Sequence, residues 1–151
     1  GGPVCAADLS VGLFRLFTCI RVSDSLADGF SYFYAEVQRL KALLNALEEP
    51  GARPLFFLID EIFRGTNNQE RLIGSRAYLR ALVGRNGLGV ISTHDLELIR
   101  LADETPLIIN RHFREDVIDD RLVFDYKLRP GPSPTTNALK IMALAGLPVE
   151  G

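Results

Sequence analysis

The chain has 151 residues, a formal net charge of −2 and 47 % hydrophobic residues. This composition predicts a single folded domain over residues 1–151 and excludes a disordered tail. The basic residues are scattered, which argues against a broad phosphate-binding surface in this part of the protein. The apolar run "LFFLI" (55–59) is far too short to span a membrane, and the first residues do not resemble a secretory signal. We therefore expect a cytoplasmic chain with no membrane segment.

The first predicted elements are a strand over 12–22, a turn at 23–29 and a helix over 30–47. An apolar stripe with spacings of four, three, four and three residues indicates the helix, and we expect that stripe to face a core. Its members are Phe33, Val37, Leu40, Leu44 and Leu47.

Two strand–helix pairs follow, which is typical of a parallel sheet. The strand over 55–59 is continuously apolar, so we expect it to be covered on both faces, and the strand over 88–93 is predicted to be a second buried strand. Asn67 and Glu70 form a variant of the capping box at the start of the helix predicted over 67–84. The predicted elements are strand 55–59, helix 67–84, strand 88–93 and helix 95–103.

The last third of the chain predicts a hairpin and a final helix. The hairpin consists of strands over 106–113 and 121–128, joined by an acidic turn at 114–120, and the helix covers 135–146 after a loop at 129–134. The predicted fold is therefore α/β, with a mostly parallel sheet flanked by helices and a hairpin at its edge.

Asp60 and Glu61 stand directly after the apolar strand 55–59. In open parallel sheets ligands bind at the carboxyl ends of the strands. There one carboxylate can hold Mg²⁺ and a second can orient or deprotonate a water molecule. The alternative is helix capping, which is the weaker interpretation because the next helix is predicted to begin only near Asn67. Arg64 and Gly65 lie in the intervening turn, where a contact with a partner subunit and a simple turn are both open.

His94 follows strand 88–93 as the acidic pair follows strand 55–59. If these strands are neighbours, the three side chains converge at one edge, where a histidine can donate a hydrogen bond to a phosphate oxygen. Alternatively, Ser92 and Asp95 cap the following helix. A Ser92–His94–Asp95 triad is disfavoured because its members are too close together on one short segment.

Gly29 and Ser31 precede the first long helix. Gly29 allows a ligand to approach the backbone closely, and a helix start with free N–H groups can bind an anion. An ordinary cap by Ser31 after a glycine turn is the alternative.

In this order and spacing, the segments resemble the ATPase domain of the MutS mismatch-repair family, a branch of the ABC-type ATPases. The resemblance covers nearly the whole chain, including "FDYKLRPGPSPTTNALKIMALAGLPVE" at its carboxyl end. It implies a partial P-loop NTPase (ABC-type) fold, with Asp60 toward Mg²⁺, Glu61 as catalytic base and His94 near the γ-phosphate. It also implies that Gly29 and Ser31 contact the ATP of a partner subunit in a homodimer. ATP and Mg²⁺ are the implied cofactors, and DNA would be bound by regions outside this chain.

The chain departs from the family's pattern in three ways. Tyr32 stands where the family usually has a small hydroxyl residue, and Phe63 stands where it usually has glycine. The motif G-x-x-x-x-G-K-[ST], whose backbone cradles phosphates, is absent, since none of the three lysines follows a glycine. In the family this cradle would lie just upstream of Gly1. We therefore expect a fragment or one part of a split chain that is inactive alone, from a parent protein that hydrolyses ATP.

Two other functions remain open from the sequence. One is a non-catalytic module that dimerises or docks a partner. The other is a different ABC-type ATPase, from a chromosome-organising protein or a transporter. The carboxyl-terminal segment "RPGPSPTTNALKIMALAG" favours the MutS side, because the others are not expected to carry it.

Overall fold

The computed structural model describes residues 3–20, 32–118, 121–134, 142–143 and 146–148. The chain divides into two compact units, Gly1–Leu98 (unit 1) and Ile99–Gly151 (unit 2). Whether they act as one domain stays a prediction. In the described part of the chain, no helix combines the length and the apolar character that crossing a membrane requires.

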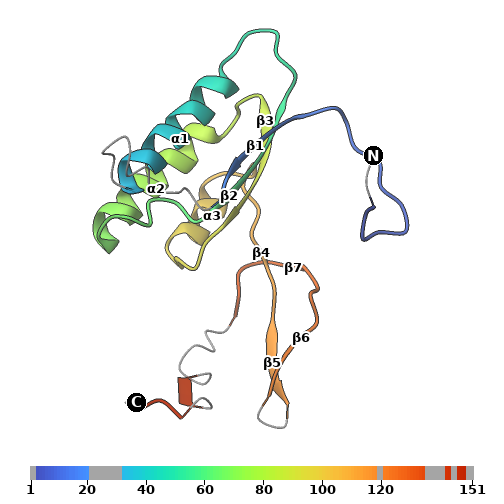
Figure 1. Ribbon diagram of the computed structural model, residues 1–151, viewed down its shortest axis with the longest axis vertical. Helices are drawn as coiled ribbons and strands as arrows, with labels where there is room; N and C mark the ends of the chain where they lie inside the picture. The colour runs from blue at the N-terminus through green and yellow to red at the C-terminus, as the bar shows by residue number, and fades with distance from the viewer. Residues whose placement is uncertain (1–2, 21–31, 119–120, 135–141, 144–145, 149–151) are drawn as a thin grey trace. The chain divides into compact units, whose positions relative to one another are not determined.

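Unit 1 contains a three-stranded parallel sheet, which confirms the predicted α/β class (Figure 1). Its strands are β1 (Arg15–Cys19), β2 (Leu55–Asp60) and β3 (Gly87–Ser92), and β2 lies in the middle. Both strand pairs are parallel, so the carboxyl ends of β2 and β3 lie at the same edge. The predicted strand 12–22 is longer than β1, which begins only at Arg15.

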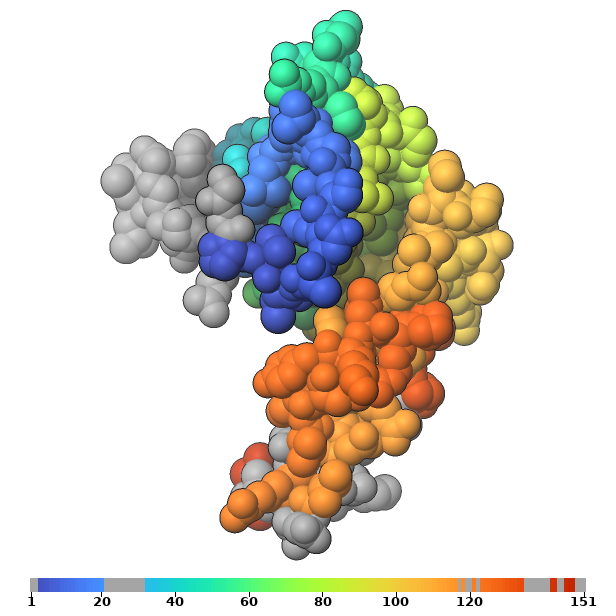
Figure 2. All heavy atoms as spheres, turned by 90° about the vertical axis from the view of Figure 1, so that its right-hand side faces the viewer, coloured from blue at the N-terminus to red at the C-terminus, as the bar shows by residue number. Residues whose placement is uncertain are grey.

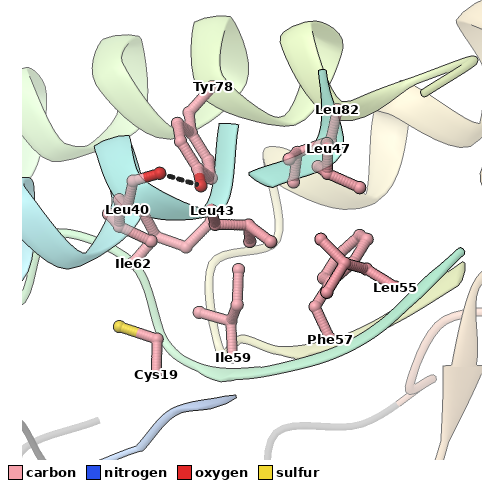
Figure 3. Close-up of a cluster of buried hydrophobic side chains, with 10 residues drawn as sticks. All are labelled: Cys19, Leu40, Leu43, Leu47, Leu55, Phe57, Ile59, Ile62, Tyr78 and Leu82. Atoms are coloured by element: carbon pink, nitrogen blue, oxygen red, sulfur yellow. Dashed lines mark hydrogen bonds between the residues drawn. The ribbon is translucent and has the colours of Figure 1, made fainter. Parts of the chain in front are cut away.

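Helices α1 (Tyr32–Leu47) and α2 (Asn68–Leu82) both lie on one face of this sheet (Figure 1, Figure 3). The residues of α1 that are buried are Glu36, Leu40, Leu43 and Leu47. The predicted stripe is therefore rotated, because Phe33 is 37 % exposed. The hydrophobic core is formed by Cys19, Leu40, Leu43, Leu47, Leu55, Phe57, Ile59, Ile62, Tyr78 and Leu82.

The predicted cap of α2 is present. The Asn67 Oδ1 atom accepts a hydrogen bond from the backbone N–H of Glu70 at 3.0 Å. The Glu70 carboxylate does not reach back to Asn67. It accepts a hydrogen bond of 2.8 Å from the hydroxyl of Thr66, so the same residues fix the loop that leads into the helix.

Neither α1 nor α2, the long helices of unit 1, covers the second face of the sheet, and its side chains are exposed, so the expectation of strands buried on both faces was wrong. On that face Leu16 is 67 % exposed, and Leu88 and Val90 are each 59 % exposed. Figure 2 views this side of unit 1, where the N-terminal residues (blue) and β3 (yellow-green) reach the surface. One sheet face therefore presents apolar side chains to solvent.

Unit 2 contains short antiparallel pairs. Strand β4 (Arg111–His112) pairs with β7 (Arg129–Pro130), and β5 (Glu115–Ile118) pairs with β6 (Arg121–Phe124). The 3₁₀ turn η1 (Leu98–Arg100) leads from unit 1 into the short helix α3 (Leu101–Glu104).

These observations correct three predictions about the last third of the chain. The strand over 106–113 is reduced to β4, and most of the predicted acidic turn is strand β5. The hairpin forms its own two-stranded sheet and is not paired with the parallel one. Acidic residues are tolerated in β5 because they are at the surface, and Asp116 accepts hydrogen bonds of 3.0 and 2.7 Å from Arg114. The predicted helix 135–146 lies largely outside the described residues.

Candidate functional site

The acidic pair lies at the carboxyl end of the central strand. Asp60 is the last residue of β2, and the backbone N–H of Glu61 donates to the Ser92 carbonyl oxygen at 3.2 Å, which extends the contact with β3. Helix α2 begins only at Asn68, so neither carboxylate caps it.

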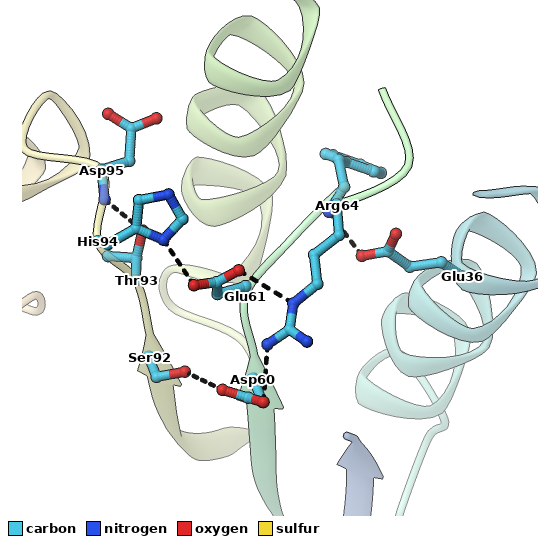
Figure 4. A network of polar contacts seen from close by, with 9 residues as sticks. Glu36, Asp60, Glu61, Arg64, Ser92, Thr93, His94 and Asp95 are labelled. Carbon is cyan, nitrogen blue, oxygen red and sulfur yellow. Dashed lines mark hydrogen bonds and ion pairs between the residues drawn. The ribbon is translucent and has the colours of Figure 1, made fainter. Parts of the chain in front are cut away.

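The ends of β2 and β3 bring the predicted residues together (Figure 4). The Nδ1–H group of His94 donates to Glu61 Oε1 at 2.6 Å, since a carboxylate can only accept. The Ser92 hydroxyl donates to Asp60 Oδ1, also at 2.6 Å. Three predicted side chains thus meet at one sheet edge, and Ser92, considered as a helix cap and as a member of a disfavoured triad, joins them through Asp60.

Asp95 has a local role instead of a place in a catalytic triad. Its backbone N–H donates to the Thr93 hydroxyl at 3.0 Å, and its Oδ1 atom accepts from the backbone N–H of Glu97 at 3.2 Å. These bonds shape the turn after β3, and the helix predicted from residue 95 begins only with η1 at Leu98.

Arg64 connects the two carboxylates, a role that the sequence reasoning missed. Its Nη2 group donates to Asp60 Oδ2 at 2.7 Å, and its Nε group lies 3.0 Å from Glu61 Oε2 (Figure 4). Partial burial lowers the pKa of Arg64, but the hydrogen bond that Arg64 donates to Asp60 and the charges of both acids outweigh it, so the pKa is raised. Arg64 lies four residues after Asp60 and three after Glu61, and this spacing was the signal that the sequence offered.

The turn after β2 has an unusual backbone. Glu61 and Phe63 have φ angles of 58° and 57°, in the left-handed region that disfavours side chains. The Phe63 ring is held between those of Phe33 and Tyr78, each with a centroid distance of 6.2 Å. The MutS-like pattern usually has glycine at position 63, and the left-handed backbone found there favours glycine. In this chain the position is occupied by Phe63, whose ring is held by its aromatic neighbours.

Glu36 of α1 contacts this turn and was also missed. It is only 2 % exposed, and its Oε1 atom accepts a hydrogen bond of 2.6 Å from the backbone N–H of Phe63 (Figure 4). Among the described residues, its Oε2 atom is buried without a hydrogen-bond partner. Burial raises the pKa of this carboxyl group, although backbone donors at Phe63 and Arg64 oppose the shift.

A small pocket lies beside Glu61 and His94. Its volume is about 10 Å³, which is room for about one water molecule. Arg71 and Ser75 of α2 and Thr93 after β3 complete its walls. The pocket can hold a water molecule next to the Glu61 carboxylate, but not a nucleotide.

In the part of the chain that the structure describes, no group of three or more His, Cys, Asp or Glu side chains is placed to hold a metal ion. Mg²⁺, however, usually takes one or two protein carboxylates and completes its shell with water and phosphate oxygens. Asp60 offers one such carboxylate at the end of β2, where its Oδ1 atom accepts from the Ser92 hydroxyl and its Oδ2 atom from Arg64. Gly29 and Ser31 lie outside the described residues.

Comparisons with known proteins point in one direction. The family model described as "MutS domain V" matches residues 1–150. The chain is 35 % identical over 149 residues to "DNA mismatch repair protein MutS 2" of Haloarcula marismortui, covering 97 % of this chain and 15 % of that protein. It is 34 % identical over 154 residues to "DNA mismatch repair protein MutS" of Chloroflexus aurantiacus, covering 99 % of this chain and 16 % of the relative. The chain thus spans less than a fifth of the length of these relatives.

Proposed function

The chain belongs to the MutS domain V family, and from this premise we propose that it supplies the metal-holding and water-activating part of an ATPase site in a MutS-like DNA repair protein. The observation that carries the proposal is the meeting of Glu61 and His94, 2.6 Å apart, beside Asp60 at one end of two parallel strands. With this function we propose a partial P-loop NTPase fold of the ABC type.

Glu61 is the proposed general base. Two groups fix its carboxylate, His94 at Oε1 and Arg64 at Oε2, while its side chain remains 29 % exposed. A water molecule in the adjacent pocket could give up its proton to this carboxylate as it attacks the terminal phosphate. His94, whose side chain is 67 % exposed, would stabilise the developing charge by donating from its other ring nitrogen in the protonated form.

Asp60 is the proposed ligand for magnesium. When bound, Mg²⁺ neutralises charge on the transferred phosphoryl group. Asp60 is held by the Ser92 hydroxyl and the Arg64 guanidinium, so its carboxylate is oriented in advance. Arg64 must share or release Oδ2 for a metal ion to bind there.

The remaining parts of the site are proposed to come from elsewhere. No phosphate-cradling motif is present in the 151 residues, so the proposal places the cradle in another segment of a longer parent protein. Gly29 and Ser31 would contact the ATP of a second subunit, and this contact would couple dimerisation to nucleotide binding. Binding of DNA through other regions and a cytoplasmic location are part of the same proposal.

The decisive experiment replaces Glu61 in the parent protein. Glu61→Gln keeps the shape of the side chain but removes the base, so ATP should bind and hold the dimer while steady-state hydrolysis falls by about 10²-fold or more. Glu48→Gln is the matched control, because Glu48 is an exposed carboxylate that pairs with Arg85 outside this site. Turnover by Glu61→Gln equal to that of the control would exclude the assigned role.

A non-catalytic docking module is the second candidate for the isolated chain. It is favoured by the apolar side chains that are exposed on one sheet face in the described part of the chain and by the missing phosphate cradle. Calorimetry of the 151-residue chain with Mg-ATP tests this point, and we expect no measurable binding. Tight binding would show that these residues hold the nucleotide without a separate cradle.

A further inference from the structure

Glu36 is a carboxylate in an apolar environment. It lies on the buried face of α1, together with Leu40 and Leu43, and only 2 % of its surface is exposed. Burying a carboxylate with one oxygen unpartnered is costly, and an apolar side chain of similar volume would usually serve the core as well or better. Hydrophobic packing alone therefore does not explain this residue.

The partner of Glu36 is the backbone of the turn that follows β2, at Phe63. Its Oε1 atom accepts the N–H of Phe63 at 2.6 Å, and Phe63 lies between Glu61 and Arg64 in the sequence. Phe63 has a φ angle of 57°, a conformation that persists only when its surroundings hold it in place.

The turn is also close to α1 on a second side. A Cβ atom added to Gly65 would lie 2.8 Å from Cβ and 3.2 Å from Cα of Phe33. The turn thus contacts α1 through a hydrogen bond at Phe63 and through close packing at Gly65. Between these two contacts lies Arg64, the residue that holds both carboxylates.

We propose that Glu36 is a positioning residue, whose buried carboxylate anchors the backbone of Phe63 and thereby holds Glu61 and Arg64 in their arrangement with His94 and Asp60. The effect of Glu36 on ATP hydrolysis rests on the proposed function, whereas its anchoring of the Phe63 backbone does not. Glu36 itself does not touch the reacting groups. Its function is to keep the turn in the one conformation that presents the base.

Two substitutions separate positioning from stability. Glu36→Gln retains an oxygen that accepts the Phe63 N–H, so the turn should keep its geometry. Glu36→Leu removes the acceptor of the Phe63 N–H but fills the same space with apolar atoms and removes a buried carboxyl group, so the chain should still fold. In the parent protein, Glu36→Leu should lower kcat for ATP by about 10²-fold with little change in KM, because a misplaced base impairs the chemical step. Glu36→Gln should restore kcat to near the wild-type value.

The stability control is Tyr78→Phe. The Tyr78 hydroxyl donates to the Leu40 carbonyl oxygen at 2.8 Å, so this change removes a buried bond between α1 and α2 but keeps the ring that packs against Phe63. It should lower the melting temperature without lowering kcat.

Amide hydrogen exchange at Phe63, measured on the same proteins, provides a readout that does not need hydrolysis. Exchange should be faster in Glu36→Leu than in wild type and Glu36→Gln. If the wild-type parent shows no turnover, the proposed function fails, and exchange at Phe63 alone decides the positioning role. Turnover or Phe63 exchange in Glu36→Leu that matches wild type would overturn the proposal.

Discussion

At the scale of single residues, the burial of Glu36 makes the stability of the chain depend on pH. Burial raises its pKa above the usual value of 4.5, so the folded chain holds this proton more tightly than the unfolded chain. The contribution of Glu36 is then most favourable below pH 4.5 and is lost as the pH rises through the raised pKa.

This linkage predicts a difference between wild type and Glu36→Gln. As the pH rises from 4.5 toward neutrality, the free energy of unfolding of wild type should fall relative to that of the variant, which cannot ionise at this position. Urea denaturation at a series of pH values measures the difference. Glu36→Leu also lacks the titrating group and should give a profile parallel to that of Glu36→Gln. A wild-type profile parallel to both would contradict the raised pKa.

At the scale of elements, the pairing of β2 with β3 depends on a missing side chain. A Cβ atom at Gly89 would lie 1.8 Å from the Phe57 ring, so glycine is required for that ring to lie across β3 as part of the core. The register places Phe57 directly opposite Gly89.

Gly89→Ala should therefore destabilise unit 1 by about 1–3 kcal/mol, because the Phe57 ring has to leave its position. Denaturant unfolding measures the loss. Phe57→Leu in the same chain should reduce the cost of the alanine, which a double-mutant cycle detects as coupling. Gly12→Ala is the control, because its Cβ would meet its nearest atom at an ordinary 3.7 Å. Equal effects at Gly89 and Gly12 would contradict this packing.

The elements that the sequence predicts well are those whose signals are local. The apolar runs place β2 and β3 within about one residue, and Asn67 marks the start of α2. The convergence of Glu61 and His94 was also predictable, because parallel strands end at the same edge.

Other features depend on contacts that spacing does not reveal. In α1 the apolar residues allow two stripes, and tertiary packing selects the one that contains Glu36 instead of the one that contains Phe33. In the hairpin, "REDVIDD" has the composition of a turn, yet cross-strand pairing makes most of it β5. Arg64 contacts both Asp60 and Glu61 in a turn whose backbone is left-handed at Glu61 and Phe63. Neither residue is a glycine, so the sequence did not indicate this backbone conformation.

At the scale of the whole molecule, the apolar side chains exposed on one face of the parallel sheet should dominate the behaviour of the isolated chain. Leu16, Leu88 and Val90 come from β1 and β3 and expose more than half of their surface, and contiguous apolar surface of this kind marks an interaction site or an aggregation hazard.

We predict that the isolated chain binds a hydrophobic fluorescent dye and that the double substitution Leu88→Thr, Val90→Thr reduces the signal at least about twofold, since it removes apolar area from this face. Circular dichroism should be unchanged. Ile73→Thr is the control, because Ile73 is 62 % exposed on α2, away from the sheet face. A wild-type chain that binds no dye, or an equal loss of signal with the control, would contradict the prediction.

The position of Arg64 has a consequence for how Asp60 and Glu61, at the carboxyl end of β2, respond to ions. Because its guanidinium already spans Asp60 and Glu61, the chain brings its own counter-ion to this site. A divalent cation that bound Asp60 would therefore replace the Arg64 guanidinium there. The displaced guanidinium would then be available to an anion close by, so that gain of a cation and capture of a phosphate group become one linked event.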